Sequence, residues 1–273
     1  MSDLETMELL SEPELIQVRN VSVEGRAITG SDKPSKAIMR SVENAVQTFD
    51  LIQTGDRIAV GCSGGKDSLL LISVFKQLKQ RQDLKFEFKV IHLDQGQPGF
   101  DHETFERSLK RLDVECEIID RDTWSVVEKK LKPGQIPCSI CSRMRRGILN
   151  HWCAEHGYNK LALGHHLDDA LETFFLNLLF GRRLDPLKAI TPASSSPTLT
   201  IRPLLFVDER KIRGWLSTAA IDAVSCPVCD NFPRAKRRDI KTVIQQFTQL
   251  NPDVYRSVEQ AIYGGSSPWF GDL

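Results

Sequence analysis

The sequence has no apolar run of the roughly 18 to 20 residues that a membrane-spanning helix requires. It also lacks an excess of either charge, since 36 Lys and Arg residues balance 36 Asp and Glu residues. The opening MSDLETMELLSEPEL is acidic, unlike a secretion or mitochondrial import signal. We therefore expect a cytoplasmic protein without a membrane partner. Any basic surface for nucleic acid must be local.

The 273 residues are enough for one large domain with additions. Residues 1–35 show no sustained periodicity and end in a segment rich in Gly, Ser, Asp and Pro, which predicts a mobile or loosely docked arm. We divide the rest into a nucleotide-binding domain, residues 36–206, and a C-terminal helical segment, residues 207–273. No internal repeat is apparent.

Short apolar runs alternate with segments of helical spacing between residues 38 and 181. A helix leads into the strand RIAVGC, and three further strands, FKVIHLD, ECEIID and KLALGH, are each separated by a helix of ten or more residues. Such spacing implies parallel pairing and predicts an α/β fold with a doubly wound parallel sheet. Ligands bind beyond the carboxyl ends of such strands, so the loops after Cys62, Leu93 and Gly164 are the first candidates for a site.

The segment SGGKDS, Ser63 to Ser68, follows one of these strands and opens a helix. Gly64 and Gly65 let the backbone approach an anion, the first helical N–H groups and the helix dipole favour negative charge, and Lys66 adds a cation. The spacing differs from a GxxxxGK[ST] loop, and Asp67 occupies the place of the Ser or Thr that would hold magnesium there. The alternative is a glycine turn with a solvated lysine.

This segment resembles the signature of the pyrophosphate-loop ATPases. The resemblance implies cleavage of ATP between the α and β phosphates and transfer of AMP to a carbonyl oxygen. That implies adenylation, which makes the oxygen of a urea-like base carbonyl a good leaving group.

A second strand end carries GHHLDD, residues 164–169. Local physics allows a capped helix with a solvated histidine. Its similarity to the GHHxDD segment of tRNA-modifying pyrophosphate-loop enzymes implies a loop beside the nucleotide and its metal. On that basis Asp168 is the preferred magnesium-associated carboxylate, and His165 and His166 lie near the phosphates or the base. Asp94, at the end of another strand, is a further nucleotide-binding candidate.

Four of the 7 cysteines form two CxxC pairs, Cys138 with Cys141 and Cys226 with Cys229. A disulfide framework is not expected in a reducing compartment, so the pairs indicate a metal site. Because 85 positions separate Cys141 from Cys226 (226 − 141 = 85), only tertiary folding could join them. Spacing alone leaves a four-cysteine structural zinc site and an iron–sulfur cluster equally favoured, with a redox thiol pair third.

A longer set of segments is similar, in order, to the tRNA 2-thiocytidine synthetase family: SGGKDS, LDQGQPGF, CSICSRMRRGIL, ALGHHLDDALETFFLNLLFG, IRPL and CPVC. The resemblance implies a [4Fe-4S] cluster with one iron left free to bind the sulfur that attacks the base. Carried over, Cys138 and Cys141 are ligands, and Cys229 is favoured over Cys226 as the third. The N-terminal arm, Ser225, Asp230 and the region after Gly181 depart from the family pattern.

Basic residues flank these motifs, which suits an RNA backbone, although solvated helix faces are the alternative. The RNA-binding candidates are Arg143, Arg145, Arg146, Arg237 and Arg238. A base that undergoes chemistry must be unstacked, and a single-stranded loop releases it most readily.

We therefore predict an enzyme that thiolates a tRNA cytidine at C2, with ATP, Mg²⁺ and a [4Fe-4S] cluster. The catalytic candidates are Lys66, Asp67 and Asp168, and the nucleotide site adds Ser63, Gly64, Gly65, Ser68, Asp94, His165 and His166. The expected partners are tRNA and a sulfur donor such as a cysteine desulfurase, and a homodimer is left open. The alternatives are a lysidine-synthetase-like ligase, a tRNA 2-thiouridine synthetase, and an ATP- and RNA-binding module with structural zinc.

Overall fold

A computed structural model describes residues 17–22, 32–81, 83–131, 137–194, 196–227 and 235–264. The strands are β1 Gln17–Val21, β2 Arg57–Gly61, β3 Glu87–Asp94, β4 Cys116–Asp120, β5 Lys160–Ala162, β6 Ile190–Pro192 and β7 Leu199–Ile201. The α-helices are α2 Lys36–Thr48, α3 Lys66–Lys79, α4 His102–Leu112, α5 Trp124–Lys130, α6 Cys138–Glu155, α7 Leu167–Leu176, α8 Glu209–Ala219, α10 Ala235–Leu250 and α11 Val254–Tyr263. A π-helical turn, η2 Asn177–Gly181, extends α7.

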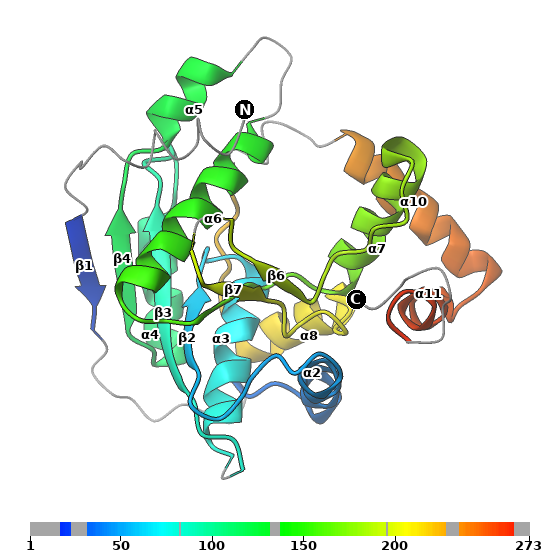
Figure 1. The fold of residues 1–273 in the computed structure, drawn as a ribbon, viewed down its shortest axis with the longest axis horizontal. Helices are drawn as coiled ribbons and strands as arrows, with labels where there is room; N and C mark the ends of the chain where they lie inside the picture. The colour runs from blue at the N-terminus through cyan, green and yellow to red at the C-terminus, as the bar shows by residue number, and fades with distance from the viewer. Residues whose placement is uncertain are drawn as a thin grey trace.

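The strands form one seven-stranded sheet in the order β1-β4-β3-β2-β5-β7-β6 (Figure 1). β2 pairs in parallel with β3 and β5, and the β3–β4 and β5–β7 pairs are parallel as well. This centre confirms the predicted doubly wound sheet. Both edge strands are antiparallel, β1 to β4 and β6 to β7, so the sheet is parallel at its centre and mixed as a whole.

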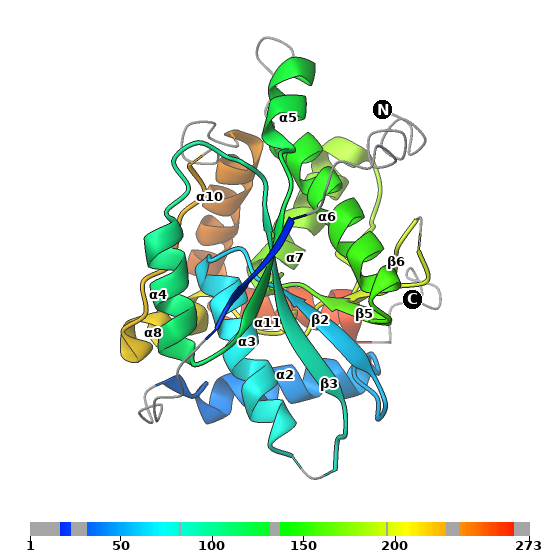
Figure 2. The same ribbon diagram turned by 90° about the vertical axis from the view of Figure 1, so that its left-hand side faces the viewer.

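Helices cover both faces of the sheet because successive strand side chains point to opposite sides. Ile58 and Val60 of β2 belong to the larger core, which α2, α3, α4 and α8 complete, whereas Ala59 joins a second core with Leu149 and Trp152 of α6. In Figure 2, α4, α3 and α8 lie on one side of the strands and α6 on the other. α3 is apolar on most of its surface because it is enclosed between the sheet and α8.

A third cluster joins α7, α10 and α11 beside the sheet (Figure 1). Leu167 and Leu171 of α7 pack against Ile240 and Ile244 of α10. α8, the first helix of the C-terminal segment, contributes Trp215 to the main core. The chain after residue 207 is thus divided between the sheet layers and this helical group.

Some elements differ from the sequence predictions. β1 lies within the segment predicted as a mobile or loosely docked arm, and α5 and β6 were not predicted. The sequence pattern predicts that the helix before the strand KLALGH begins near Arg143. α6 begins instead at Cys138, because Pro137 stands at its N-terminus with φ of −66°, the value that proline imposes and that a helix requires. The first CxxC pair therefore lies in the first turn of a helix. The remainder of the predicted arm, residues 1–16 and 23–31, lies outside the described residues.

The strand order reverses direction at β2, since β3 and β4 lie to one side of it and β5 and β7 to the other. Such a switch point leaves a crevice beyond the carboxyl ends of the central strands. Ser63–Ser68 follow β2 and Gly164–Asp169 follow β5, so the fold brings the two predicted loops to the same crevice.

Candidate active site

The crevice is a cavity of about 660 Å³, a size typical of small-molecule sites. Its wall includes residues of every motif that the sequence singled out. The predicted site residues that line it are Ser63, Gly65, Asp67, Ser68, Asp94, His165, Cys138, Cys141, Cys226, Arg145, Arg146 and Arg237. The predicted residues that lie outside its wall are Gly64, Lys66, His166, Asp168, Arg143 and Arg238.

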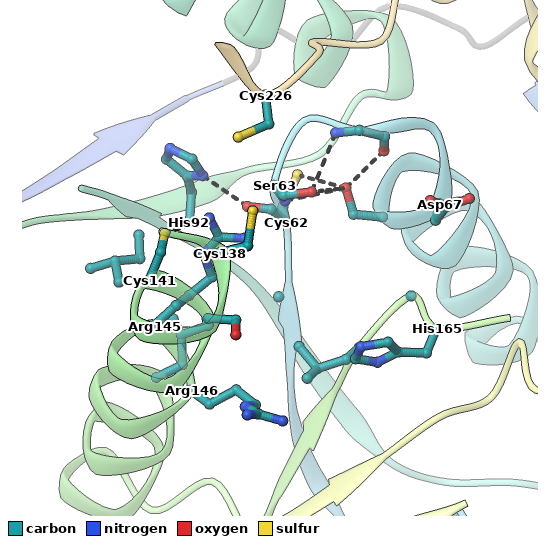
Figure 3. A pocket seen from close by; sticks show the side chains of 18 of the residues that line it. Cys62, Ser63, Asp67, His92, Cys138, Cys141, Arg145, Arg146, His165 and Cys226 are labelled. Carbon is teal, nitrogen blue, oxygen red and sulfur yellow. Dashed lines mark hydrogen bonds between the residues drawn. The ribbon is translucent and has the colours of Figure 1, made fainter. Parts of the chain in front are cut away.

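The loop after β2 is held in an open turn by its own serines (Figure 3). The Ser68 hydroxyl donates to the Gly65 carbonyl at 2.9 Å and accepts from the Ser63 N–H at 3.2 Å. Gly64 has φ of +78°, and a Cβ there would lie 2.9 Å from Phe105, so both conformation and space require glycine. The loop thus places backbone N–H groups and the N-terminus of α3 at the cavity, an arrangement that binds phosphate.

The loop after β5 packs directly on the phosphate loop. A Cβ on Gly164 would lie 2.9 Å from the carbonyl carbon of Asp67 and 3.1 Å from the N–H nitrogen of Ser68. His166 is buried, with its Nε2 atom 3.5 Å from Asp67 and 3.6 Å from Asp169. Gly164 is therefore the residue that allows the two predicted loops to form one site.

Asp168 and Asp169 have different environments. Asp168 accepts from the Glu209 N–H at 2.7 Å and from the Tyr255 hydroxyl at 2.9 Å. Burial alone would raise the pKa of Asp168, but bonds from His166, the Glu209 N–H and Tyr255 hold it below its ordinary value. Asp169, in contrast, lines the cavity. The geometry thus gives Asp168 a role in joining α7, α8 and α11 and leaves Asp169 facing the site.

Lys66 points toward α8. Its Nζ atom lies 3.0 Å from Asp67 and 3.2 Å from Glu209, and Glu209 also binds Lys241 at 2.7 Å. Burial alone would lower the pKa of Lys66, but the two carboxylates raise it. Burial likewise opposes ionisation of Glu209, yet Lys241 and Lys66 bring its pKa down to about 2. The lysine is charged and held beside the phosphate loop.

Cysteines from both CxxC pairs meet in the cavity. Cys138 and Cys141 come from α6, and Cys226 comes from the segment after α8 (Figure 3). That segment is tied to the phosphate loop, because the Val224 N–H donates to the Gly64 carbonyl at 2.9 Å. Cys229 lies outside the described residues. The structure therefore joins at least three of the four thiols by tertiary folding, as their spacing required.

Two glutamines surround these thiols. The Gln97 side chain donates to the Cys141 sulfur at 3.2 Å and lies 3.9 Å from the Cys226 sulfur. The Gln95 oxygen accepts from Arg145 at 2.8 Å and from the Cys141 thiol at 3.4 Å. Burial raises the pKa of the Cys141 thiol, and the Arg145 guanidinium opposes that shift.

In the described ranges, no three His, Cys, Asp or Glu side chains are grouped as a single metal ion would require. A four-iron cluster is larger than one ion, so its thiolate ligands stand farther apart than those of zinc. The described wall also includes Cys62 of the phosphate loop, whose thiol is buried so that its pKa rises to about 11. Cys138, Cys141 and Cys226 face the cavity together, and three such thiols fit a cluster held by three protein ligands.

Sequence reasoning missed several residues of the wall or its support: Gln95, Gln97, Asp169, Arg202 and Glu209. Gln95 and Gln97 belong to the LDQGQPGF segment and Arg202 belongs to IRPL. The spacing of residues in these segments does not indicate which of their side chains line a cavity. Glu209 follows the helix-capping Asp208 and gave no signal, since its partner Lys66 is 143 positions away (209 − 66 = 143).

Among the helices of the described residues, none combines the length and apolar composition of a bilayer span.

A model of the PP-loop domain family matches residues 34–240. The tRNA-cytidine(32) 2-sulfurtransferase of Alkalilimnicola ehrlichii is 38% identical over 217 residues, which is 80% of this chain and 69% of that protein. The tRNA-cytidine(32) 2-sulfurtransferase 1 of Francisella tularensis is 37% identical over 221 residues, 81% of this chain and 83% of that protein.

Among solved structures, the fold is similar to that of the U34-tRNA thiolase NcsA from Methanococcus maripaludis, determined with its [4Fe-4S] cluster. The TM-score is 0.65 at 20% identity, with 83% of this chain and 76% of the thiolase covered. At this identity the comparison supports a shared fold.

Proposed function

This chain belongs to the PP-loop family of tRNA-cytidine(32) 2-sulfurtransferases, and we propose that it replaces the C2 oxygen of a tRNA cytidine with sulfur in an ATP-dependent reaction. Family membership makes it a transferase that thiolates tRNA. The observation that supports the mechanism best is that the phosphate loop and thiols of both CxxC pairs line one cavity. We take cytidine 32 as the target because the relatives' names specify it.

In the first step, the C2 carbonyl oxygen of the cytidine attacks the α-phosphorus of ATP and pyrophosphate leaves. The N–H groups of residues 63–68 and the N-terminus of α3 hold the phosphates, and Lys66 adds positive charge beside them. Mg²⁺ would neutralise the leaving pyrophosphate. Asp67 and Asp169 fit that ion better than Asp168, because they face the cavity while both oxygens of Asp168 are already hydrogen-bonded.

In the second step, a sulfur nucleophile attacks C2 and AMP departs with the former C2 oxygen. When bound, a [4Fe-4S] cluster with one iron free of protein ligands would supply a position for that sulfur. We assign its protein ligands to Cys138, Cys141 and Cys226. We choose Cys226 because it faces the cavity beside Gln97 and Cys141. Cys229, the residue favoured from the sequence, lies outside the described residues.

The RNA contact would involve Arg145, Arg146 and Arg237, which line the cavity from α6 and α10. Arg237 lies 3.6 Å from both Asp169 and Glu172, so part of its charge is balanced within the protein. Arg143 and Arg238 are exposed outside the wall and would contact the backbone at a distance from the base. We further propose a cysteine desulfurase as the source of sulfur, and a homodimer stays a proposal.

The test is 2-thiocytidine formation on tRNA from a strain that lacks this modification, with anaerobically reconstituted protein, ATP, Mg²⁺ and sulfide. We expect 2-thiocytidine at position 32 that depends on ATP, with one AMP released per thiolation. A protein that consumes ATP but joins an amino acid to cytidine would instead support the lysidine-synthetase-like alternative. A colourless protein with bound zinc and no turnover would support the binding-module alternative.

A further inference from the structure

Arg202 is a buried cation in the wall of the cavity that no step above uses. It follows β7, its side chain and backbone are only 3% exposed, and it lines the cavity. One guanidinium nitrogen, Nη1, donates to the Lys188 carbonyl at 2.7 Å and to the Thr191 hydroxyl at 2.9 Å. These two bonds fix the plane of the guanidinium. Its buried Nε–H finds no acceptor among the described residues.

A buried guanidinium without a carboxylate is costly unless something else balances it. In the part of the chain that the structure describes, no carboxylate forms a salt bridge with Arg202. Asp169 acts on it from a distance, but that carboxylate already accepts from the His166 N–H and pairs with Arg237. Burial and the neighbouring Arg146 lower the pKa of Arg202 to about 10, which still leaves it charged at neutral pH.

Two more donors face the same part of the cavity. Arg146 comes from α6 and His165 from the loop after β5, and Figure 3 shows both on the side of the pocket away from Cys226. The Nδ1 atom of His165 is buried and has no partner among the described residues. Burial, with Arg202 and Arg146 nearby, lowers the pKa of His165 to about 4, so near pH 7 it is neutral and offers one N–H.

We propose that Arg202, Arg146 and His165 form a second phosphate-binding subsite, separate from the Ser63–Ser68 loop. Two guanidinium groups and an imidazole provide several N–H donors and positive charge, which match the oxygens of a phosphate group. The Ser63–Ser68 loop and Lys66 are already assigned to the phosphates of ATP. The three residues of the proposed subsite therefore give the cavity a second anion-binding position. This inference rests on the proposed function, because it assigns both anion-binding positions to the same reaction.

A phosphate at this place could come from the adenylate or from the RNA chain next to the target cytidine. If it comes from the adenylate, the subsite holds the phosphate of AMP after pyrophosphate has left. If it comes from RNA, the subsite fixes the nucleotide beside the unstacked base. Binding of the two molecules separates these sources.

The experiment compares Arg202→Lys and Arg146→Ala with the unchanged protein and with Arg40→Ala. Arg40 is an exposed arginine of α2, outside the cavity wall, so it controls for loss of one charge. Titration calorimetry would measure the Kd of two probes, AMP and a short single-stranded RNA with cytidine at its centre. Melting temperatures establish that each variant is folded. Arg146 is exposed, so Arg146→Ala should fold and keeps the test valid even if the substitution of the buried Arg202 does not.

We expect both variants to raise the Kd of at least one probe about tenfold or more, and Arg40→Ala to leave both unchanged. Weaker binding of AMP alone assigns the subsite to the adenylate, and weaker binding of RNA alone, with a smaller salt dependence, assigns it to the RNA backbone. Unchanged affinity for both probes in a folded variant overturns the proposal. These experiments measure binding, so their result is valid even if no thiolation is detected. Absence of thiolation would overturn the proposed function and leave the subsite proposal standing.

Discussion

The Nζ atom of Lys66 lies 3.2 Å from the Glu209 carboxylate, which joins the phosphate loop to the first turn of α8. Glu209 also binds Lys241 of α10, so one carboxylate connects the loop with two helices that lie far from it in the sequence. Lys66 is therefore kept charged and close to the cavity without lining its wall.

Replacement of Lys66 or Asp67 by alanine should lower ATP-dependent thiolation at least about a hundredfold, because each change removes charge from the place where pyrophosphate leaves. Iron content should stay unchanged, since neither residue belongs to the cysteine group. Lys36→Ala, an exposed change in α2, is the control. Turnover near that of the unchanged protein in either variant would remove the loop from the mechanism.

Glu209 should stabilise the fold in a pH-dependent manner. Its pKa falls from an ordinary value of 4.5 to about 2 in the folded protein, so its contribution is complete above about pH 4.5 and is lost as the pH falls toward 2. The difference in Tm between the unchanged protein and Glu209→Gln should therefore shrink from pH 7 to pH 3. Glu103→Gln, at an exposed position, should show a smaller difference at pH 7. A larger Glu209→Gln difference at pH 3 than at pH 7 would contradict the assignment.

Gly164→Ala should disrupt the site while the fold survives. The new Cβ would meet the backbone of Asp67 and Ser68 at about 3 Å, so the two loops must separate. We expect a loss of thiolation of at least about tenfold. Gly214→Ala is the matched control, because nothing lies within 4 Å of the new methyl group. In helix α8 that change should stabilise the protein by about 0.5–1 kcal/mol. Equal activity of the two variants would show that the close contact has no function.

Arg19 should support the nucleotide site from the edge strand β1. Its guanidinium binds Asp120 at 2.8 Å and reaches Asp94, a cavity residue, at 3.2 Å. Arg19→Ala leaves these two neighbouring carboxylates without that cation, so the KM for ATP should rise about two- to fivefold with little change in kcat. The double variant Arg19→Ala/Asp120→Asn should recover part of the loss, because it removes one of the negative charges. A KM equal to that of the unchanged protein would leave Arg19 with a structural role alone.

The sequence predicted the parallel centre of the sheet and the two loops because their signals are local. SGGKDS stands between an apolar strand and an apolar helix, and GHHLDD repeats that arrangement. The edge strands escaped prediction because β1 and β6 are short and partly polar, and their pairing depends on neighbours distant in sequence.

The spacing of the cysteines predicted a joint site but not its ligands. The segment of Cys226 is tied to the phosphate loop by the bond from the Val224 N–H to the Gly64 carbonyl, a contact that no local pattern encodes. The sequence likewise does not separate the environments of Asp168 and Asp169. Both are acidic residues in the first turn of α7, and only the tertiary contacts with Glu209 and Tyr255 distinguish them.

In the proposed mechanism, three thiols, including that of Cys226, hold an iron–sulfur cluster beside the phosphate loop. The most direct measurement is the iron and sulfide content, after anaerobic reconstitution, of Cys226→Ser and Cys229→Ser, with Cys138→Ala and Cys153→Ala as the positive and negative controls. Cys153 is buried in the second core and serves there as a small apolar side chain. We expect loss of iron and sulfide in Cys226→Ser and Cys138→Ala and retention of both in Cys229→Ser and Cys153→Ala. Zinc in the unchanged protein, with equal metal loss from Cys226→Ser and Cys229→Ser, would contradict it.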